Sequence, residues 1–272
     1  MDCLKVAGSE LKEFRDAIHG AEAVTILSHN TFFTMAKKRK TILKSIGIIF
    51  LKVIFLFAIV SFFQVLFFKL IDPFTSSVML QRNIVNITTD SKIKPVRYEW
   101  YDYDQISKNL AIAVVAAEDQ NFPFHIGFDF EQIGRAISDK SKGKRLRGAS
   151  TITQQVAKNL FLWEGKSFIR KGLEAYYTIL IEFLWSKRRT LEIYLNIAEM
   201  GNNIFGAGAV SKLYFHKKPK LLTKREAALI AAILPNPHRF SVVHPTQYVL
   251  ERQKWILKQM KSLGGVSYLK NL

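Results

Sequence analysis

The chain has 272 residues, enough for one ordinary domain and a smaller segment. Hydrophobic residues make up 49% and charged residues 23%, which excludes a disordered or collagen-like chain. The single cysteine, Cys3, excludes an intramolecular disulfide framework and a cysteine-based zinc site. The formal net charge of +18 suits nucleic acid, an anionic bilayer or a phosphate-bearing substrate, so charge alone does not select a partner.

Residues 1–45 precede the first long apolar run and form a short amino-terminal segment. Residues 1–34 have a mixed composition, whereas Met35 opens the cluster Met-Ala-Lys-Lys-Arg-Lys, which is typical of a cytoplasmic leader. We therefore expect Met35 to be the true initiator and residues 1–34 to be a misassigned start. A peptide from residues 5–39, detected by mass spectrometry of the native protein, would contradict this expectation.

Residues 46–68 read IGIIFLKVIFLFAIVSFFQVLFF and are interrupted only by Lys52, Ser61 and Gln64. As a helix this segment would be about 34 Å long, which matches the hydrocarbon core of a bilayer. Lys52 lies near the start, where its long side chain can reach the head groups. A buried core helix would show a polar stripe and a signal peptide would be shorter, so the segment predicts a transmembrane helix.

Basic residues precede this helix and set its predicted orientation. They are Lys37, Lys38, Arg39, Lys40 and Lys44. By the positive-inside rule the amino terminus stays in the cytoplasm and everything after Phe68 faces the periplasm or the exterior. Nucleic acid is not an expected partner there, so the phosphates of membrane phospholipids explain the positive charge better.

Residues 69–97 form a connector, and the stretch 72–105 leans towards strand and turn. From residue 98 to residue 272 many segments carry apolar residues at helical spacing, which predicts a mainly α domain. Capping boxes mark several helix starts, and prolines or glycines mark several ends. The capping pairs are Asp129 with Gln132, Thr151 with Gln154, and Thr223 with Glu226.

Three of these predicted helices carry polar residues that could form a site. The run LAIAVVAA delivers Glu118 and Asp119 to a helix end, where the dipole and a second carboxylate should raise the pKa of a general base. A solvated helix terminus is the alternative. The next helix places Thr151, Gln155 and Lys158 on one face as donors for sugar hydroxyls and phosphate oxygens. A third helix buries Ile169 and Leu173 and carries the pair Arg170 and Glu174, which by spacing alone is a surface salt bridge.

Five stretches of this domain resemble, in their residues and in their order along the chain, the motifs of the bacterial peptidoglycan glycosyltransferases of family 51. They are Glu118-Asp-x-x-Phe122-x-x-His125-x-Gly127, Gly148-Ala-Ser-Thr-Ile-Thr-Gln-Gln155-x-x-Lys158-Asn159, Arg170-Lys171-x-x-Glu174, Lys187-x-x-Thr190-Leu-Glu192-x-Tyr194-Leu-Asn196 and Ala231-Ala-x-Leu234-Pro235-x-Pro237. Because the transmembrane segment comes first and no penicillin-binding module follows, the chain resembles the monofunctional biosynthetic form of Gram-negative bacteria. Thr190 and Met200 depart from the usual pattern.

The resemblance implies a lysozyme-like α-helical lobe and a smaller lobe partly sunk in the membrane. It also implies that the enzyme polymerises lipid II into glycan strands. The C4 hydroxyl of an acceptor N-acetylglucosamine would attack C1 of the donor, releasing undecaprenyl pyrophosphate with inversion. By resemblance Glu118 is the general base and Glu174 the second essential carboxylate. The substrate-binding residues would be Asp119, Ser150, Thr151, Gln154, Gln155, Lys158, Asn159, Lys166, Arg170 and Lys171.

The same resemblance assigns structural support to Phe122, His125, Gly127, Glu192, Tyr194 and Asn196. It implies a single-pass inner-membrane protein with a periplasmic catalytic domain. Its expected partners are lipid II, the growing strand, phospholipids and proteins of cell-wall synthesis or division. No residue set demands a metal, although Mg²⁺ or Mn²⁺ assists some relatives at the pyrophosphate. A membrane-bound lytic transglycosylase and a non-catalytic glycan-binding or lipid-binding scaffold remain alternatives.

Overall fold

The computed structural model describes residues 44–88, 95–141 and 150–272, together with Arg15. Met35 and the basic cluster 37–40 lie outside the described residues, as do Gly148 and Ala149 of the second motif stretch. Internal contacts divide the chain into two units, residues 1–60 and residues 61–272, which we describe separately.

The predicted transmembrane segment lies within one continuous helix, Lys44–Leu70. Only 6% of its most apolar window is buried, so it is not the core helix of a soluble domain, and its length fits a single-pass membrane anchor. Residues from Ser61 onwards belong to the second unit, where Ser61 and Val65 are buried.

The second unit is mainly α, as predicted. After the apolar helix the chain continues with α2 (Ser77–Thr88), β1 (Arg97–Tyr98), η1 (Tyr103–Gln105), α3 (Lys108–Glu118), α4 (Phe130–Ser141), α5 (Ile152–Phe161), α6 (Phe168–Leu184), α7 (Lys187–Ile197), β2 (Glu199–Gly201), β3 (Ile204–Phe205), α8 (Gly206–Phe215), η2 (Pro219–Leu221), α9 (Lys224–Ile233), α10 (Gln247–Ser262) and η3 (Gly265–Asn271).

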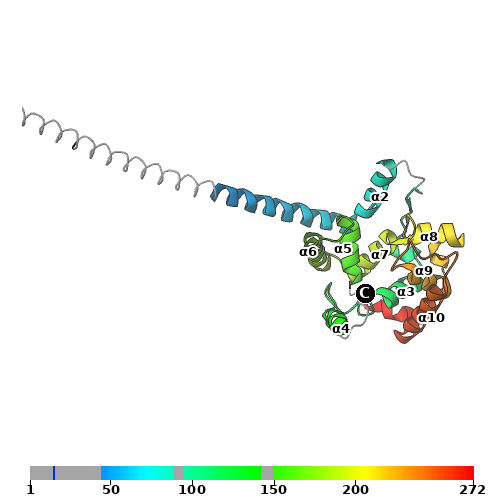
Figure 1. The fold of residues 1–272 in the computed structure, drawn as a ribbon. Helices are drawn as coiled ribbons and strands as arrows, with labels where there is room; N and C mark the ends of the chain where they lie inside the picture. Colours follow the sequence, from blue (N-terminus) through cyan, green and yellow to red (C-terminus); the bar gives the residue numbers. More distant parts are fainter. Residues whose placement is uncertain (1–14, 16–43, 89–94, 142–149) are drawn as a thin grey trace, which may run out of the picture. The chain divides into compact units, whose positions relative to one another are not determined.

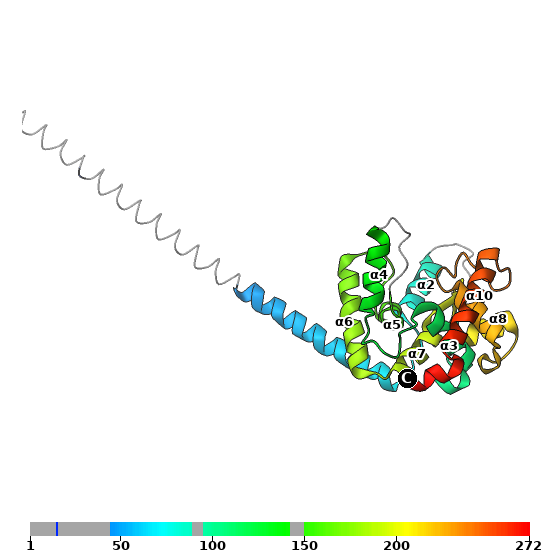
Figure 2. The same ribbon diagram turned by 90° about the horizontal axis from the view of Figure 1, so that it is seen from below.

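Two groups of helices form the body of this unit (Figures 1 and 2). In one group α5 packs against both α6 and α7, and in the other α3, α9 and α10 pack against one another. The α3 segment Leu110–Ala116 is buried on every side, which explains its small, uniformly apolar residues. The groups meet where the carboxyl end of α3 approaches the start of α5.

A small three-stranded sheet packs against α8, and its strand β2 also contacts α9; the strand order is β1-β3-β2. β1 runs parallel to β3, with Arg97 opposite Ile204, and β2 runs antiparallel to β3. Asn203, in the turn between β2 and β3, has a positive φ of 58°. The sheet joins the segment before α3 to the segment after α7.

The capping signals read from the sequence are confirmed. Thr151 and Gln154 form a reciprocal capping box on α5, and Thr223 and Glu226 form one on α9. Asp129 accepts a hydrogen bond from the backbone N–H of Gln132 at 2.8 Å. These signals are reliable because both partners lie within one helical turn.

Two local predictions are wrong. Within the stretch predicted to lean towards strand, residues 77–88 form α2, whose Val78 and Met79 are buried. Its β-branched residues indicated a strand, but packing against α5 outweighs that weak preference. Ile169 was predicted to be buried and is 74% exposed, because α6 turns Phe168, Ile169 and Phe183 outwards.

Candidate active site

Glu118 is the last residue of α3, and its side chain is only 15% exposed. Its Oε2 accepts a hydrogen bond from Nε2 of Gln155 on α5 at 3.0 Å. Its Oε1 lies 3.5 Å from Nη2 of Arg252 on α10. Three helices that are distant in sequence therefore converge on one carboxylate.

Burial raises the pKa of Glu118 above its usual value. The hydrogen bond from Gln155 and the positive charges of Arg252 and Lys158 lower the pKa, and Asp119 raises it, but the loss of hydration dominates. A raised pKa makes a carboxylate a stronger base, which is the property that a general base needs.

Tyr194 fixes the orientation of Gln155. The Tyr194 hydroxyl donates to Oε1 of Gln155 at 3.2 Å, and the side chain of Tyr194 is buried. Burial and the nearby carboxylates Glu118 and Asp119 raise the pKa of Tyr194 well above its usual value, so it stays a donor. Since Oε1 is occupied by this bond, the amide N–H of Gln155 is directed at Glu118.

Asp119 lies next to Glu118 in sequence but has a different environment. It is 1% exposed, and both its oxygens lie 2.9 Å from Nε2 of His125. Its Oδ2 also accepts the backbone N–H of Ile152, at the start of α5, at 2.9 Å. Asp119 therefore joins the loop after α3 to the start of α5, and substrate binding by Asp119 stays a prediction.

The loop that carries His125 depends on a glycine. Gly127 has a positive φ of 75°, and a Cβ there would lie 2.7 Å from Cγ2 of Thr178. Its carbonyl accepts a hydrogen bond from Thr151 Oγ1 at 2.7 Å. Phe122 is fully buried in the same loop. These contacts hold the loop against α5 and α6, and the supporting role of Phe122, His125 and Gly127 in the reaction stays a prediction.

A second carboxylate, Glu174, lies on α6 among cations. It is 3% exposed, its Oε2 is 2.8 Å from Nη1 of Arg170, and its Oε1 pairs with Nζ of Lys171. The spacing of Arg170 and Glu174 alone favoured a surface pair, but the structure buries the carboxylate. Burial of Glu174 without these cations would be costly, so the cluster is held together by charge.

Lys158 on α5 is electrostatically linked to both carboxylates. Burial lowers its pKa, Glu174 acts in the opposite direction, and Arg170 and Lys171 lower it further. The positive charge of Lys158 in turn lowers the pKa of Glu118. Within the described part of the chain, the Lys158 ammonium has no carboxylate within 4 Å. It is therefore a cation available to an anionic ligand.

The remaining predicted site residues have varied surroundings. Thr151 and Gln154 are buried and are used in the α5 capping box, and Asn159 is half-buried on the same helix. Ser150 and Lys166 are exposed. Glu192 and Asn196 do not join the Glu118 cluster, because they hold the segment 101–103 through hydrogen bonds to Tyr103 and Tyr101.

Sequence reasoning missed Arg252. The residue lies on the stripe of α10 that carries the buried Val249 and Ile256 at i−3 and i+4. A charged side chain on an otherwise apolar stripe is a signal that could have identified it.

Sequence reasoning also missed Glu182, which accepts hydrogen bonds from Thr153 at 2.6 Å and from Lys187 at 2.8 Å.

A metal site was not predicted from the sequence. Among residues 44–88, 95–141 and 150–272, no three His, Cys, Asp or Glu side chains are grouped so that they could hold a metal ion. The cations around Glu174 are instead supplied by lysine and arginine side chains.

Comparison with known proteins agrees with this arrangement. The transglycosylase family profile matches residues 85–261. A biosynthetic peptidoglycan transglycosylase of Xylella fastidiosa (strain M23) is 48% identical over 212 residues, which cover 78% of this chain and 87% of the relative. The protein of the same name from Xanthomonas campestris pv. campestris (strain B100) is 48% identical over 214 residues, which are 79% of this chain and 87% of the relative. The chain therefore belongs to the transglycosylase family, among the peptidoglycan glycosyltransferases that its motifs resemble.

Proposed function

We propose that this chain polymerises lipid II into glycan strands by inverting glycosyl transfer, without transpeptidase activity. One observation carries the proposal. The largely buried carboxylate of Glu118 is coupled electrostatically to Lys158, which pairs with no carboxylate among the described residues; Lys158 is coupled in turn to the buried carboxylate of Glu174 and its partners Arg170 and Lys171. A base and a set of cations are the two elements that this reaction needs.

Glu118 would act as the general base. It takes the proton from the C4 hydroxyl of the acceptor N-acetylglucosamine as that oxygen bonds to C1 of the donor sugar. A sugar hydroxyl is a poor nucleophile without a base, and the raised pKa of Glu118 makes its carboxylate a stronger base. The attack inverts the configuration at C1.

The cations would stabilise the leaving group. As the bond from C1 to the pyrophosphate oxygen breaks, negative charge develops on undecaprenyl pyrophosphate. Lys158, Arg170 and Lys171 are the groups that would hold this charge, and Glu174 would position them. A pyrophosphate leaves without an acid, whereas a hydrolytic enzyme must protonate the leaving oxygen. This cation set therefore favours synthesis over lytic cleavage.

The substrate would be taken from the bilayer. We propose that the helix Lys44–Leu70 spans the inner membrane, with the amino terminus in the cytoplasm and residues 61–272 on the periplasmic side. Exposed apolar side chains on α6 and in the segment 124–130 would contact lipid, including Phe168 at 97% and Ile126 at 81% exposure. A cysteine introduced at Lys254 should react with a membrane-impermeant maleimide added to spheroplasts.

We propose further that any Mg²⁺ or Mn²⁺ that assists the reaction is bound by the pyrophosphate of the substrate and not by a metal site in the protein. Polymerisation by the purified enzyme should then fall only modestly in EDTA and recover with either cation. Abolished activity that only one metal restores would contradict this part of the proposal.

Fluorescently labelled lipid II tests the proposed function directly. The full chain should convert it into polymer, and Glu118→Gln should abolish conversion while membrane insertion and fold persist. Lys158→Met should reduce turnover far more than Lys212→Met, since Lys212 is an exposed lysine on α8. Breakdown of purified sacculi would instead identify a lytic enzyme, and absence of both activities would identify a scaffold.

A further inference from the structure

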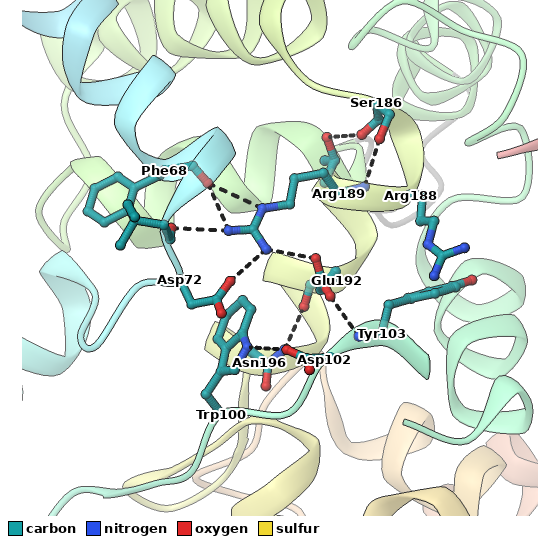
Figure 3. A network of polar contacts seen from close by, with 12 residues as sticks. Phe68, Asp72, Trp100, Asp102, Tyr103, Ser186, Arg188, Arg189, Glu192 and Asn196 are labelled. Atoms are coloured by element: carbon teal, nitrogen blue, oxygen red, sulfur yellow. Dashed lines mark hydrogen bonds and ion pairs between the residues drawn. The ribbon is translucent and has the colours of Figure 1, made fainter. Parts of the chain in front are cut away.

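Arg189, near the start of α7, holds the end of the apolar helix with its whole guanidinium group (Figure 3). Nε and Nη2 donate to the carbonyl of Phe68 at 3.2 and 3.0 Å, and Nη2 also donates to the carbonyl of Ile71 at 3.1 Å. Nη1 donates to Asp72 at 2.8 Å and to Glu192 at 2.7 Å. Since arginine has five N–H donors, every one has an acceptor.

This arrangement stabilises the end of the helix. The Phe68 carbonyl is one of the last four, which have no partner inside an α-helix, and the helix dipole places negative charge there. The guanidinium group supplies both the donors and the positive charge, and it lies 5.4 Å from the ring of Trp100. Lysine could not replace it, because a single ammonium group has three donors and no planar fork.

Other contacts attach the same part of the helix to α6 and to Trp185, which follows it. Trp185 Nε1 donates to the carbonyl of Val65 at 2.8 Å, and Tyr177 donates to Gln64 at 3.2 Å. The hydroxyl groups of Ser61 and Tyr176 lie 2.7 Å apart. Residues 61–72 are therefore bonded along their length to the same helices that flank the candidate site.

α7 joins this attachment to the catalytic carboxylate. Glu192 bonds Arg189 and also accepts the backbone N–H of Tyr103 at 2.6 Å. Two residues further along, on the opposite face of α7, Tyr194 bonds Gln155, which bonds Glu118. One short helix thus carries both the attachment of the apolar helix and the support of the proposed base.

We propose that Arg189 is a positioning residue that fixes the exit of the membrane helix on α7. It thereby sets the height and tilt at which the active site meets a lipid-linked substrate at the bilayer surface. The proposal rests on the proposed function, since only a substrate held in the membrane makes this position matter. Misplacement by about 1 Å can cost about a hundredfold in rate.

The test compares Arg189→Ala with Arg188→Ala in the full chain, using labelled lipid II in two media. Arg188 is a matched control on the same helix, because it pairs with Asp104 at 2.6 Å and contacts Tyr103 but not the apolar helix. In liposomes Arg189→Ala should polymerise at least about tenfold more slowly than Arg188→Ala. In detergent micelles, where a bilayer no longer fixes the substrate, the two variants should differ little. Arg189→Lys should behave like Arg189→Ala.

An equal loss for Arg189→Ala in both media would overturn the proposal, because it would indicate a role in folding or chemistry. Equal rates for the two variants in liposomes would also overturn it. If Arg189→Ala does not fold, Asp72→Asn decides, since it removes one half-exposed acceptor and should give a smaller loss confined to liposomes. If the parent chain forms no polymer in either medium, the proposed function itself fails, a result distinct from these.

Discussion

Replacement of Arg252 by methionine tests whether charge tunes the proposed base. The Arg252 guanidinium group lies 3.5 Å from Glu118 and lowers the pKa that burial raises. Methionine keeps much of the length and apolar contact of the side chain but removes the charge. We therefore expect the pKa of Glu118 to rise further in Arg252→Met.

The size of the shift follows from Coulomb's law and exposure. Two unit charges about 4 Å apart interact by about 4 kcal/mol at an effective dielectric constant of about 20. Each 1.36 kcal/mol or so corresponds to about one pKa unit, so the unscreened limit is about three units. The side chains are 17% and 15% exposed and water screens the pair, so we expect a shift of about one unit.

The assay is the initial rate of lipid II polymerisation across a series of pH values. Glu118 acts in its ionised form, so the rate rises as pH increases through its pKa. The acidic limb of the Arg252→Met profile should therefore move to higher pH, and the rates should converge above it. Lys258→Met, which removes one exposed positive charge from the same helix, should leave the limb unchanged. An unmoved or acid-shifted limb in Arg252→Met would refute the reasoning.

Three further predictions follow from the same site. Burial lowers the pKa of Lys158, so the alkaline limb of the rate profile should move to higher pH in Lys158→Arg, and an unmoved limb would exclude Lys158 as its source. Because the pKa of Glu118 is raised on folding, Glu118→Gln should increase the free energy of unfolding at neutral pH. This gain should vanish below about pH 4.3, where the wild-type carboxyl is protonated both folded and unfolded, and chemical denaturation at both pH values checks it. Tyr194→Phe removes the hydroxyl that orients Gln155, so it should lower kcat more than KM and cost about 1 kcal/mol of stability, whereas unchanged kcat would show that the bond is dispensable.

Helix existence and capping were predictable because their signals are local. Thr151 and Gln154 identify the start of α5 because they are spaced three residues apart, as a capping box requires. The motif order also identified Glu118, Gln155, Lys158 and Glu174, which the fold brings into one electrostatic group.

Tertiary partners were not predictable in the same way. Nothing in the spacing of Arg252 relates it to Glu118, from which it is 134 residues away in sequence. The outward direction of Ile169 and Phe183 on α6 also contradicts a rule that buries apolar residues, and a lipid environment would give those side chains an apolar partner.

The bonding of residues 61–72 to α6 and α7 affects how a truncated enzyme should be prepared. Hydropathy suggests cutting the chain directly after Phe68, at the end of the apolar run. That cut would remove the carbonyl of Val65 that accepts from Trp185, and the Phe68 ring, which lies 5.9 Å from that of Phe161. A buried donor left without its acceptor costs about 1–3 kcal/mol. A truncated protein should therefore begin no later than Ser61. It then retains a strongly apolar amino-terminal segment, which has to be taken into account in crystallisation.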